Sequence, residues 1–342
     1  STAQHWPGRR RWGGSSYAAV NGERAYRLRR TLWGPRAIDI HMAVPALWVL
    51  PGGIIDTDAA ERGTTLRLVE RQIPLLPPEI LQACRLLPAA VRPALTLSIR
   101  LDENLHPSHV GLKMSRVRPQ ARLDDRDAQS NPALQRLAEL AGALRQRRRV
   151  AGAWERLQPA PWIVLQDGQV RPAVETAAEL IDGELQLLAA EALGWWCQEH
   201  ALASIYMTRE AGAAATSGSA AGPAAAGDAL ALRTFVSESH AAHATLGTDP
   251  GQHAGLGLRN PVAGSQPTRC YVDLIMQRQI LAQVGAGPAT LSTGELQRTV
   301  METHAAREAA WRVESDSQRY WSLKWVEQLP PEQGVSCVVV EP

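Results

Sequence analysis

The chain has 342 residues, of which 45% are hydrophobic, so it is long enough to bury a core in one large or two medium domains. Its 36 basic and 34 acidic residues nearly cancel, which excludes nucleic-acid binding through net charge alone. Any site for a polyanion must therefore be local.

Cysteine spacing and hydropathy narrow the class of protein further. The four cysteines lie far apart with no CxxC pair, so we expect neither a structural zinc site nor a disulfide framework. No apolar run reaches about 18 residues, and the first residues lack the charged start and apolar core of a signal peptide. We therefore expect a cytoplasmic protein with no membrane segment.

The first 36 residues differ in composition and periodicity from the rest of the chain. They contain eight Arg, one Glu and no Asp, and they show no sustained period of two or 3.6. This pattern predicts a basic arm.

Strand-like runs follow at residues 37–44 and 47–50, then a turn at Pro51-Gly52-Gly53 and a short helix over residues 56–62. The ordered core is therefore expected to begin at Ala37.

The middle of the chain predicts one strand, two helices and one hairpin. Alternating Leu and Ile over residues 92–101 predict a strand. Apolar residues on one face of residues 132–149 predict a helix, with arginines in its last turns where cations suit the helix dipole. Residues 162–172 predict a hairpin with a type I′ turn at Asp167-Gly168, and a long helix from Ala173 to about Ala203 follows.

The last third of the chain combines a breaker-rich segment with two helices. Residues 211–229 are almost wholly Ala, Gly, Ser, Thr and Pro, which predicts a flexible surface insertion. Helices are predicted over residues 269–284 and 293–323, the second capped by Ser292 or Thr293. The apolar run at residues 335–340 predicts a final strand.

Ordered motifs from about Ile38 to Trp325 resemble the catalytic (RNB) domain of the ribonuclease II and ribonuclease R family of 3′ to 5′ exoribonucleases. The motifs that carry the resemblance are Ile40-His41-Met42-Ala43, Pro51-Gly52, Ala60-Glu61-Arg62-Gly63-Thr64-Thr65, Ile73-Pro74-Leu75-Leu76-Pro77-Pro78-Glu79, Arg92-Pro93-Ala94-Leu95-Thr96-Leu97, Ala121-Arg122-Leu123, Glu184 to Ala189, His253 to Leu258 and Tyr320-Trp321.

The resemblance implies an α+β fold in which mixed β-sheets are packed by helices around an RNA channel. Residues 37–328 would form this single RNB-like domain, after a degenerate basic segment at 1–36. Residues 329–342 would be the possible truncated start of a C-terminal β-barrel RNA-binding domain. The implied activity is hydrolysis of single-stranded RNA with Mg²⁺, which family aspartates hold. The implied partner is single-stranded RNA, and we favour a monomer.

The aspartate cluster of the family is missing from this sequence. By the family's spacing, its four aspartates fall near Ser15, Asn21, Glu23 and Arg24, so only Glu23 could bind a metal. Further departures are Val44 for an aspartate and Asp124 or Asp125 for a tyrosine. The family segment T-S-P-I-R-R-Y corresponds to residues 265–271, where one arginine is Cys270.

A local change of reading frame is one explanation for the altered middle of that motif. If residues 262–268 are translated one base later, suitable codons give Trp-Gln-Val-Ala-Ser-Pro-Leu, which is close to the family sequence. The segment 1–36 is a second candidate for such a disturbance. Resequencing of the gene distinguishes the two frames.

The resemblance also nominates individual site residues. Arg269 matches a phosphate contact, and it opens a predicted helix whose first amides could bind the same phosphate. Glu184 is a further catalytic candidate that either pairs with a channel arginine or faces solvent. His41, Arg62, His253 and Tyr271 are candidate RNA contacts. For the histidines a hydrogen-bonded structural role is the alternative, and for Arg62, beside the turn at Gly63, the structural explanation is favoured.

Two classes of function therefore remain. The first is a 3′ to 5′ exoribonuclease that uses Mg²⁺ and is impaired by the loss of its aspartates. The second is a catalytically inactive RNA-binding protein or the product of a decayed gene, which in the extreme case does not fold cooperatively.

Overall fold

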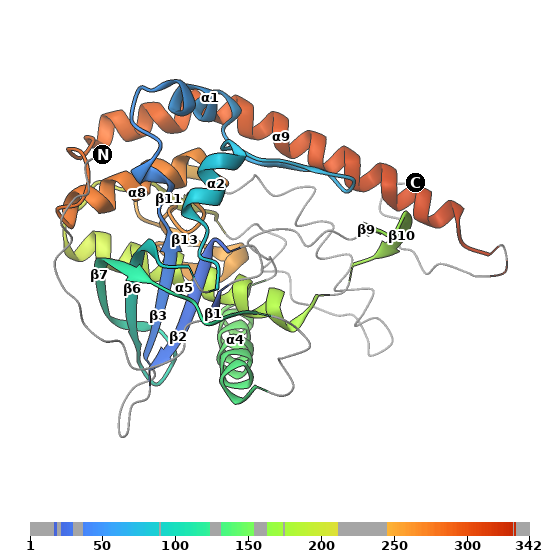
Figure 1. Ribbon diagram of the computed structural model, residues 1–342, viewed down its shortest axis with the longest axis horizontal. Helices are drawn as coiled ribbons and strands as arrows, with labels where there is room; N and C mark the ends of the chain where they lie inside the picture. Colours follow the sequence, from blue (N-terminus) through green and yellow to red (C-terminus); the bar gives the residue numbers. More distant parts are fainter. Residues whose placement is uncertain are drawn as a thin grey trace.

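A six-stranded sheet lies at the centre of the fold in the computed structural model (Figure 1). The strand order is β7-β6-β3-β2-β1-β8, and every neighbouring pair is antiparallel except β1 and β8. The strands are β1 (Tyr17–Ala18), β2 (Arg24–Arg29), β3 (Ala37–Ala43), β6 (Arg92–Leu101), β7 (Pro107–Val117) and β8 (Ala121–Arg122). The structure describes residues 17–18, 22–29, 37–88, 90–123, 131–153, 163–173, 175–210, 245–330 and 332.

The central strand β3 is covered on both faces. All seven of its residues are buried, and successive side chains of a strand point to opposite sides of the sheet. Ile38, Ile40 and Met42 therefore face one side and join the main hydrophobic core. Asp39 and His41 face the other side, which we call the outer face.

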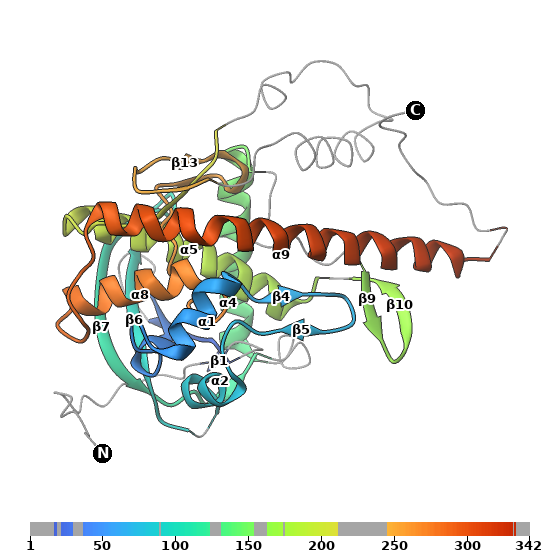
Figure 2. The same cartoon turned by 90° about the horizontal axis from the view of Figure 1, so that it is seen from above.

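Helices cover the apolar side of the sheet. The core joins the sheet to α5 (Ala177–Glu199) and α8 (Tyr271–Gln283), and α4 (Pro132–Val150) packs against α5. The longest helix, α9 (Thr293–Glu327), packs against α8 and α1 (Ile54–Arg62). Its C-terminal half runs out beside the hairpin of β9 (Ile163–Gln166) and β10 (Gln169–Pro172) (Figures 1 and 2).

Short elements complete the described part of the chain. They are the 3-10 helices η1 (Pro45–Leu47) and η3 (Ala254–Leu256), the helix α2 (Pro78–Cys84), and the paired short strands β4 (Leu66–Arg67) with β5 (Gln72–Ile73), β11 (Tyr206–Thr208) with β12 (Thr245–Gly247), and β13 (Gln252–His253) with β14 (Leu258–Arg259).

Most predicted elements are confirmed, because their periodicity was strong. Strand β6 has the predicted bounds, and β3, α1, α4, α5, α8 and α9 agree within a few residues. The hairpin turn is also confirmed, since Asp167 and Gly168 both have positive φ, at 52° and 75°, as a type I′ turn requires.

Two predicted elements were wrong, and one long strand was missed. Residues 24–29, expected in a basic arm, form β2 inside the sheet, because the buried guanidinium group of Arg24 has an acidic partner. Residues 47–50 are not a strand, since Pro45 instead starts the 3-10 helix η1. Strand β7 was not predicted, because its outward side chains are polar. The insertion at 211–229 and the strand at 335–340 lie outside the described residues.

No helix in the described ranges combines the length and the apolar character that crossing a bilayer needs.

Two glycines of α5 allow a test of how closely this helix packs against the segment at Asn260. A Cβ on Gly194 would overlap the backbone carbonyl oxygen of Asn260, whereas one on Gly183 would meet nothing within 4 Å. We expect Gly194→Ala to lower the free energy of unfolding by about 1–3 kcal/mol, because the segment at Asn260 must shift. The matched Gly183→Ala should raise it by up to about 1 kcal/mol through helix propensity. Urea unfolding of both variants measures the difference, and equal effects would contradict the close contact.

Candidate functional site: a neutralised acidic cluster

Four charged side chains meet at one end of the sheet. Glu23 and Arg24 lie at the start of β2, Asp182 lies in the first turns of α5, and Arg269 lies just before α8. These elements are far apart in sequence, and ion pairs join all of them.

Arg24 is the centre of the cluster and is 1% exposed. Its Nη2 and Nε donate to the two carboxylate oxygens of Asp182 at 2.6 and 3.0 Å, and its Nη1 donates to the carbonyl oxygen of Ser265 at 3.1 Å. The hydroxyl of Tyr26 donates to the same carboxylate. Such a bidentate pair is the strongest geometry available to a guanidinium group. Strand β2, helix α5 and the loop before α8 are therefore tied at one point.

Burial and charge act in opposite directions on these groups. Burial alone would raise the pKa of Asp182, yet the charge of Arg24 and the hydrogen bonds from Arg24 and Tyr26 outweigh it and hold that pKa below its usual value. Burial raises the pKa of Tyr26, and the nearby Asp182 carboxylate raises it further. At neutral pH the cluster therefore contains a carboxylate, a guanidinium group and a neutral phenol.

The second ion pair joins the two predicted site residues that the fold brings together. Nε of Arg269 donates to Oε1 of Glu23 at 2.7 Å, and their side chains are only 18% and 15% exposed. The other Glu23 oxygen lies 3.8 Å from Nη1 of Arg24. Glu23, the predicted metal ligand, is thus flanked by two guanidinium groups.

A backbone clamp fixes the position of Arg269. Its carbonyl oxygen accepts hydrogen bonds from the amide of Thr65 at 2.7 Å and from the hydroxyl of Thr64 at 3.1 Å. The amide of Tyr271 donates to the carbonyl oxygen of Gly63 at 2.9 Å, and Gly63 has a φ of 66° that favours glycine. Arg269 precedes α8 by two residues, so the prediction that it opens the helix was wrong.

Arg67 extends the cluster toward α9. Its backbone amide donates to Glu314 at 2.7 Å, and its guanidinium Nε lies 3.7 Å from the same carboxylate. Burial lowers the pKa of Arg67, and Arg269 nearby lowers it further, although Glu314 opposes the change. An ion pair to the long helix therefore lies near the cluster, close enough for Arg269 to act on the pKa of Arg67.

The donor set does not fit the metal that the resemblance implies. Mg²⁺ takes oxygen ligands with negative charge, and the cluster offers only Glu23 and Asp182, each already bound by an arginine. Within the described ranges no group of three or more His, Cys, Asp or Glu residues is placed to hold a metal ion. The family positions near Ser15 and Asn21 lie outside those ranges, and the sequence before Ala37 contains no Asp.

Glu184 lies in a different network, although it is only two residues from Asp182. Two residues along a helix are about 200° apart, so the side chains point to opposite sides. The carboxylate of Glu184, 2% exposed, accepts from Arg145 at 2.9 Å and from Arg148 at 2.6 Å, both on α4. Arg148 also donates to the carbonyl oxygen of Leu256 at 3.0 Å. These contacts support packing of α4 on α5.

Both histidines are buried and hydrogen-bonded within the protein. Nδ1 of His41 lies 2.8 Å from the hydroxyl of Thr96, and Nδ1 of His253 accepts from the amide of Leu256 at 3.2 Å, which caps η3. Burial lowers the pKa of each to about 4, so both are neutral at pH 7. These contacts agree with the hydrogen-bonded structural role that was the alternative to RNA contact for both histidines.

The side chains of the two remaining candidates, Arg62 and Tyr271, contact residues outside the ion-pair cluster. Arg62 is exposed on α1 and pairs with Asp58 one turn earlier at 3.0 Å. Tyr271 is 8% exposed, and its hydroxyl faces the buried pair of Asp56 and Arg278. Burial, with Asp56 next, raises the pKa of Tyr271 to about 12.

The segment 262–268 fits its surroundings as it stands. The amides of Val262 and Ala263 donate to the carbonyl oxygens of Ala190 and Ile205 at 3.0 and 2.9 Å, and both side chains are fully buried. In the shifted frame a tryptophan would replace Val262, where it would overpack the core.

Sequence patterns alone did not point to Asp182, Tyr26 or the structural use of Arg24. Asp182 interrupts an apolar helix, and an acid at such a position is a usable signal that a buried cation lies opposite. Nothing in the sequence indicates that the cation is Arg24, 158 residues away.

Comparison with known proteins agrees with this fold. Residues 19–285, most of the chain, match the family described as RNB domain. The chain belongs to this family. The match starts before Ala37, in agreement with the position of β2 in the sheet.

Individual relatives of this RNB chain cover it almost completely. A protein of Synechocystis described as an uncharacterized ribonuclease is 27% identical over 317 residues, which are 88% of this chain and 47% of the relative. Ribonuclease R of Mycoplasma genitalium, in complex with ribose-methylated single-stranded RNA, matches 90% of this chain and 56% of its own with a TM-score of 0.75 and 15% identity. Yeast Ssd1, described as a pseudonuclease, matches 89% of this chain and 43% of its own with a TM-score of 0.70 and 14% identity. The chain thus spans about half the length of these relatives.

Replacing Arg24 should show how much this cation contributes to the free energy of unfolding. We expect Arg24→Met to lower the free energy of unfolding by about 3 kcal/mol, because Asp182, whose side chain is 19% exposed, loses its cation. The double variant Arg24→Met/Asp182→Asn should recover much of that loss. Arg62→Met, which removes an exposed pair, should cost less than about 1 kcal/mol. Urea unfolding at pH 7 measures all three, and a small effect of Arg24→Met would contradict the cluster.

His253 should make stability depend on pH. Its folded-state pKa of about 4 lies below the unfolded value of 6.5, so its contribution is complete above pH 6.5 and is lost as the pH falls toward 4. Between pH 7 and pH 5 the wild type should lose about 2 kcal/mol more than His253→Asn, which keeps a capping oxygen but does not titrate. Urea unfolding at the two pH values measures this, and parallel losses would refute a buried neutral imidazole.

Proposed function

We propose that this RNB domain binds single-stranded RNA and does not cleave it by the metal-dependent reaction of its family. The observation that carries the proposal is the double pairing in the cluster, where Arg24 holds Asp182 and Arg269 holds Glu23. A guanidinium group neutralises the negative charge that each carboxylate would otherwise offer to a metal ion. Unlike a metal ion, a guanidinium group does not coordinate a water molecule and lower its pKa for attack on a phosphodiester.

The residues support an RNA-binding role for Arg269 in place of a catalytic one. Its guanidinium group is partly exposed, and the positive charge of Arg67 is close enough to interact with it electrostatically. A phosphate that displaced Glu23 could accept two hydrogen bonds from the Arg269 guanidinium group. The Mycoplasma ribonuclease R with bound single-stranded RNA and the pseudonuclease Ssd1 both have this fold.

The competing function is the one implied by family membership, hydrolysis of single-stranded RNA from its 3′ end with Mg²⁺. It requires that carboxylates other than Glu23 and Asp182 reach the scissile phosphate. We further propose that the protein acts as a monomer in the cytoplasm.

One assay separates the two functions. We expect a 5′-labelled single-stranded RNA to be bound by the full chain and to keep its length in Mg²⁺, while a ribonuclease R with its aspartates intact degrades it in parallel. Binding should persist in EDTA, because arginines and not a metal hold the phosphates. Shortening from the 3′ end that EDTA abolishes would overturn the proposal.

A variant in the same assay tests the role of Arg269. Glu23→Gln should tighten RNA binding by releasing Arg269 from its carboxylate, whereas Glu79→Gln, which removes an exposed charge on α2, should change it little. Equal effects of the two variants would place the phosphate contact elsewhere.

A further inference from the structure

The outer face of the sheet forms a basic hollow on strands β2, β3, β6 and β7. The strand register aligns its residues in three rows that cross all four strands. The rows are Ala25, His41, Thr96 and Lys113; Arg27, Asp39, Ser98 and Gly111; and Arg29, Ala37, Arg100 and His109.

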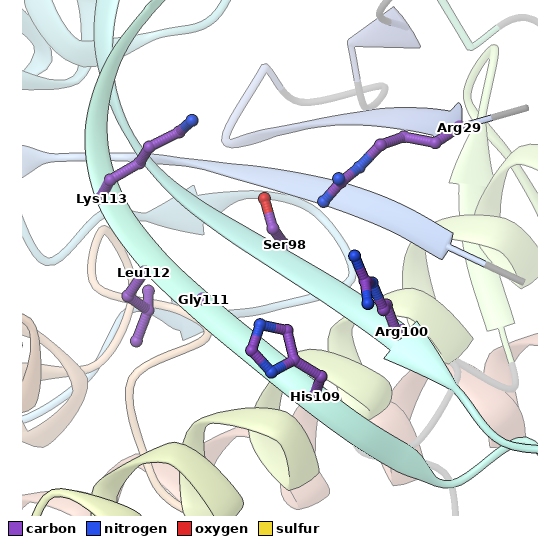
Figure 3. A pocket seen from close by; sticks show the side chains of 7 residues that line it. All are labelled: Arg29, Ser98, Arg100, His109, Gly111, Leu112 and Lys113. Atoms are coloured by element: carbon purple, nitrogen blue, oxygen red, sulfur yellow. The ribbon is translucent and has the colours of Figure 1, made fainter. Parts of the chain in front are cut away.

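The shape of the hollow follows from the residue sizes in these rows. Figure 3 shows Arg29, Arg100 and Lys113 around a floor that includes Ser98 and Gly111. Gly111 leaves room, since a Cβ there would meet nothing within 4 Å. The hollow is therefore open at its centre and cationic at its rim.

The single acid of the three rows does not reach the surface. The Asp39 side chain is 0% exposed, accepts from the Arg29 guanidinium group at 2.7 Å and accepts from the Ser98 hydroxyl at 2.7 Å. The side chains of Arg100, His109 and Lys113 lie in exposed positions of the same face. The field at the surface is therefore positive although the chain as a whole has a formal net charge of only +2.

The spacing of the cations exceeds the size of one anion. Arg100 and Lys113 lie in rows that are four residues apart along the strands, a distance of about 13 Å. A single phosphate group contacts one end of this array, whereas a chain of phosphates contacts both ends. Lys and Arg in such arrays bind nucleic acids through backbone phosphates without reading sequence.

We propose that this outer face binds the phosphate backbone of single-stranded RNA, at a site separate from the cluster of Glu23 and Arg269. The inference rests on the proposed RNA binding of this chain but not on the state of that cluster. None of the three ion pairs that join the cluster involves a residue of the three rows.

Salt dependence of RNA binding tests the outer face directly. The probe is a fluorescein-labelled oligouridylate of about 20 nucleotides, and its affinity for the full chain is measured by anisotropy over a range of salt concentrations. Removing two phosphate contacts with Arg100→Gln/Lys113→Gln should weaken binding and reduce the slope of log K against log salt by about 1.4. The matched Arg298→Gln/Arg312→Gln, on exposed positions of α9, should leave the slope unchanged.

A second pair of variants addresses the centre of the hollow. Gly111→Glu places a carboxylate among the cations and should weaken RNA binding as much as the double variant does. Gly111→Ala fills the same open space without charge and should bind as the wild type does. Unchanged thermal midpoints show that all variants are folded.

Each outcome decides between specific alternatives. If the wild type binds RNA and the outer-face variants keep its affinity and salt slope, the outer-face site is refuted and the proposed function stands. If the wild type does not bind RNA, both proposals fail. If polyglutamate of similar length displaces RNA at equal charge concentration and loses affinity in the same variants, the face is a site for an acidic protein segment, which also overturns the proposal.

Discussion

The buried ion pair of Arg24 and Asp182 is the interaction on which the rest of this structure depends. An unpaired charge in a protein interior costs several kcal/mol, so neither residue is tolerated there without the other. The pair ties a central strand to a core helix and, through Ser265, to the loop that presents Arg269. The same contact decides the chemistry of the site, because a guanidinium group now neutralises the carboxylate that a divalent ion would need.

The neighbouring backbone contacts transmit this constraint to the edge of the site. The clamp from Gly63 and Thr65 holds the residues on both sides of Cys270, and Asn260 lies in contact with α5 at Gly194. Arg269 is thereby held against Glu23 by the chain on both sides of the cluster. Backbone hydrogen bonds therefore hold the loop that carries Arg269.

The alternation of the strands separates two environments on one sheet. One face supplies the apolar core under α5 and α8, and the other carries arginines, a lysine and histidines around the buried Asp39. This second face could have been predicted for β6, where the alternation was clear. It could not be predicted for β2 and β7, because their polar outward side chains hid the strand pattern. The cations of these strands come together only because the strands pair in one sheet.

The sequence by itself determined the family, the helices and the strongly periodic strands, because these follow from local patterns of apolar residues and from ordered motifs. It also determined that the family's aspartates are missing before Ala37, and it nominated Glu23 and Arg269 as candidate site residues. Only the tertiary structure decided that these two residues pair, that Arg24 meets Asp182, and that Glu184, His41 and His253 are held by the protein itself. The physical reason is that burial and long-range pairing set the state of a charged group, and both depend on residues far away in the chain.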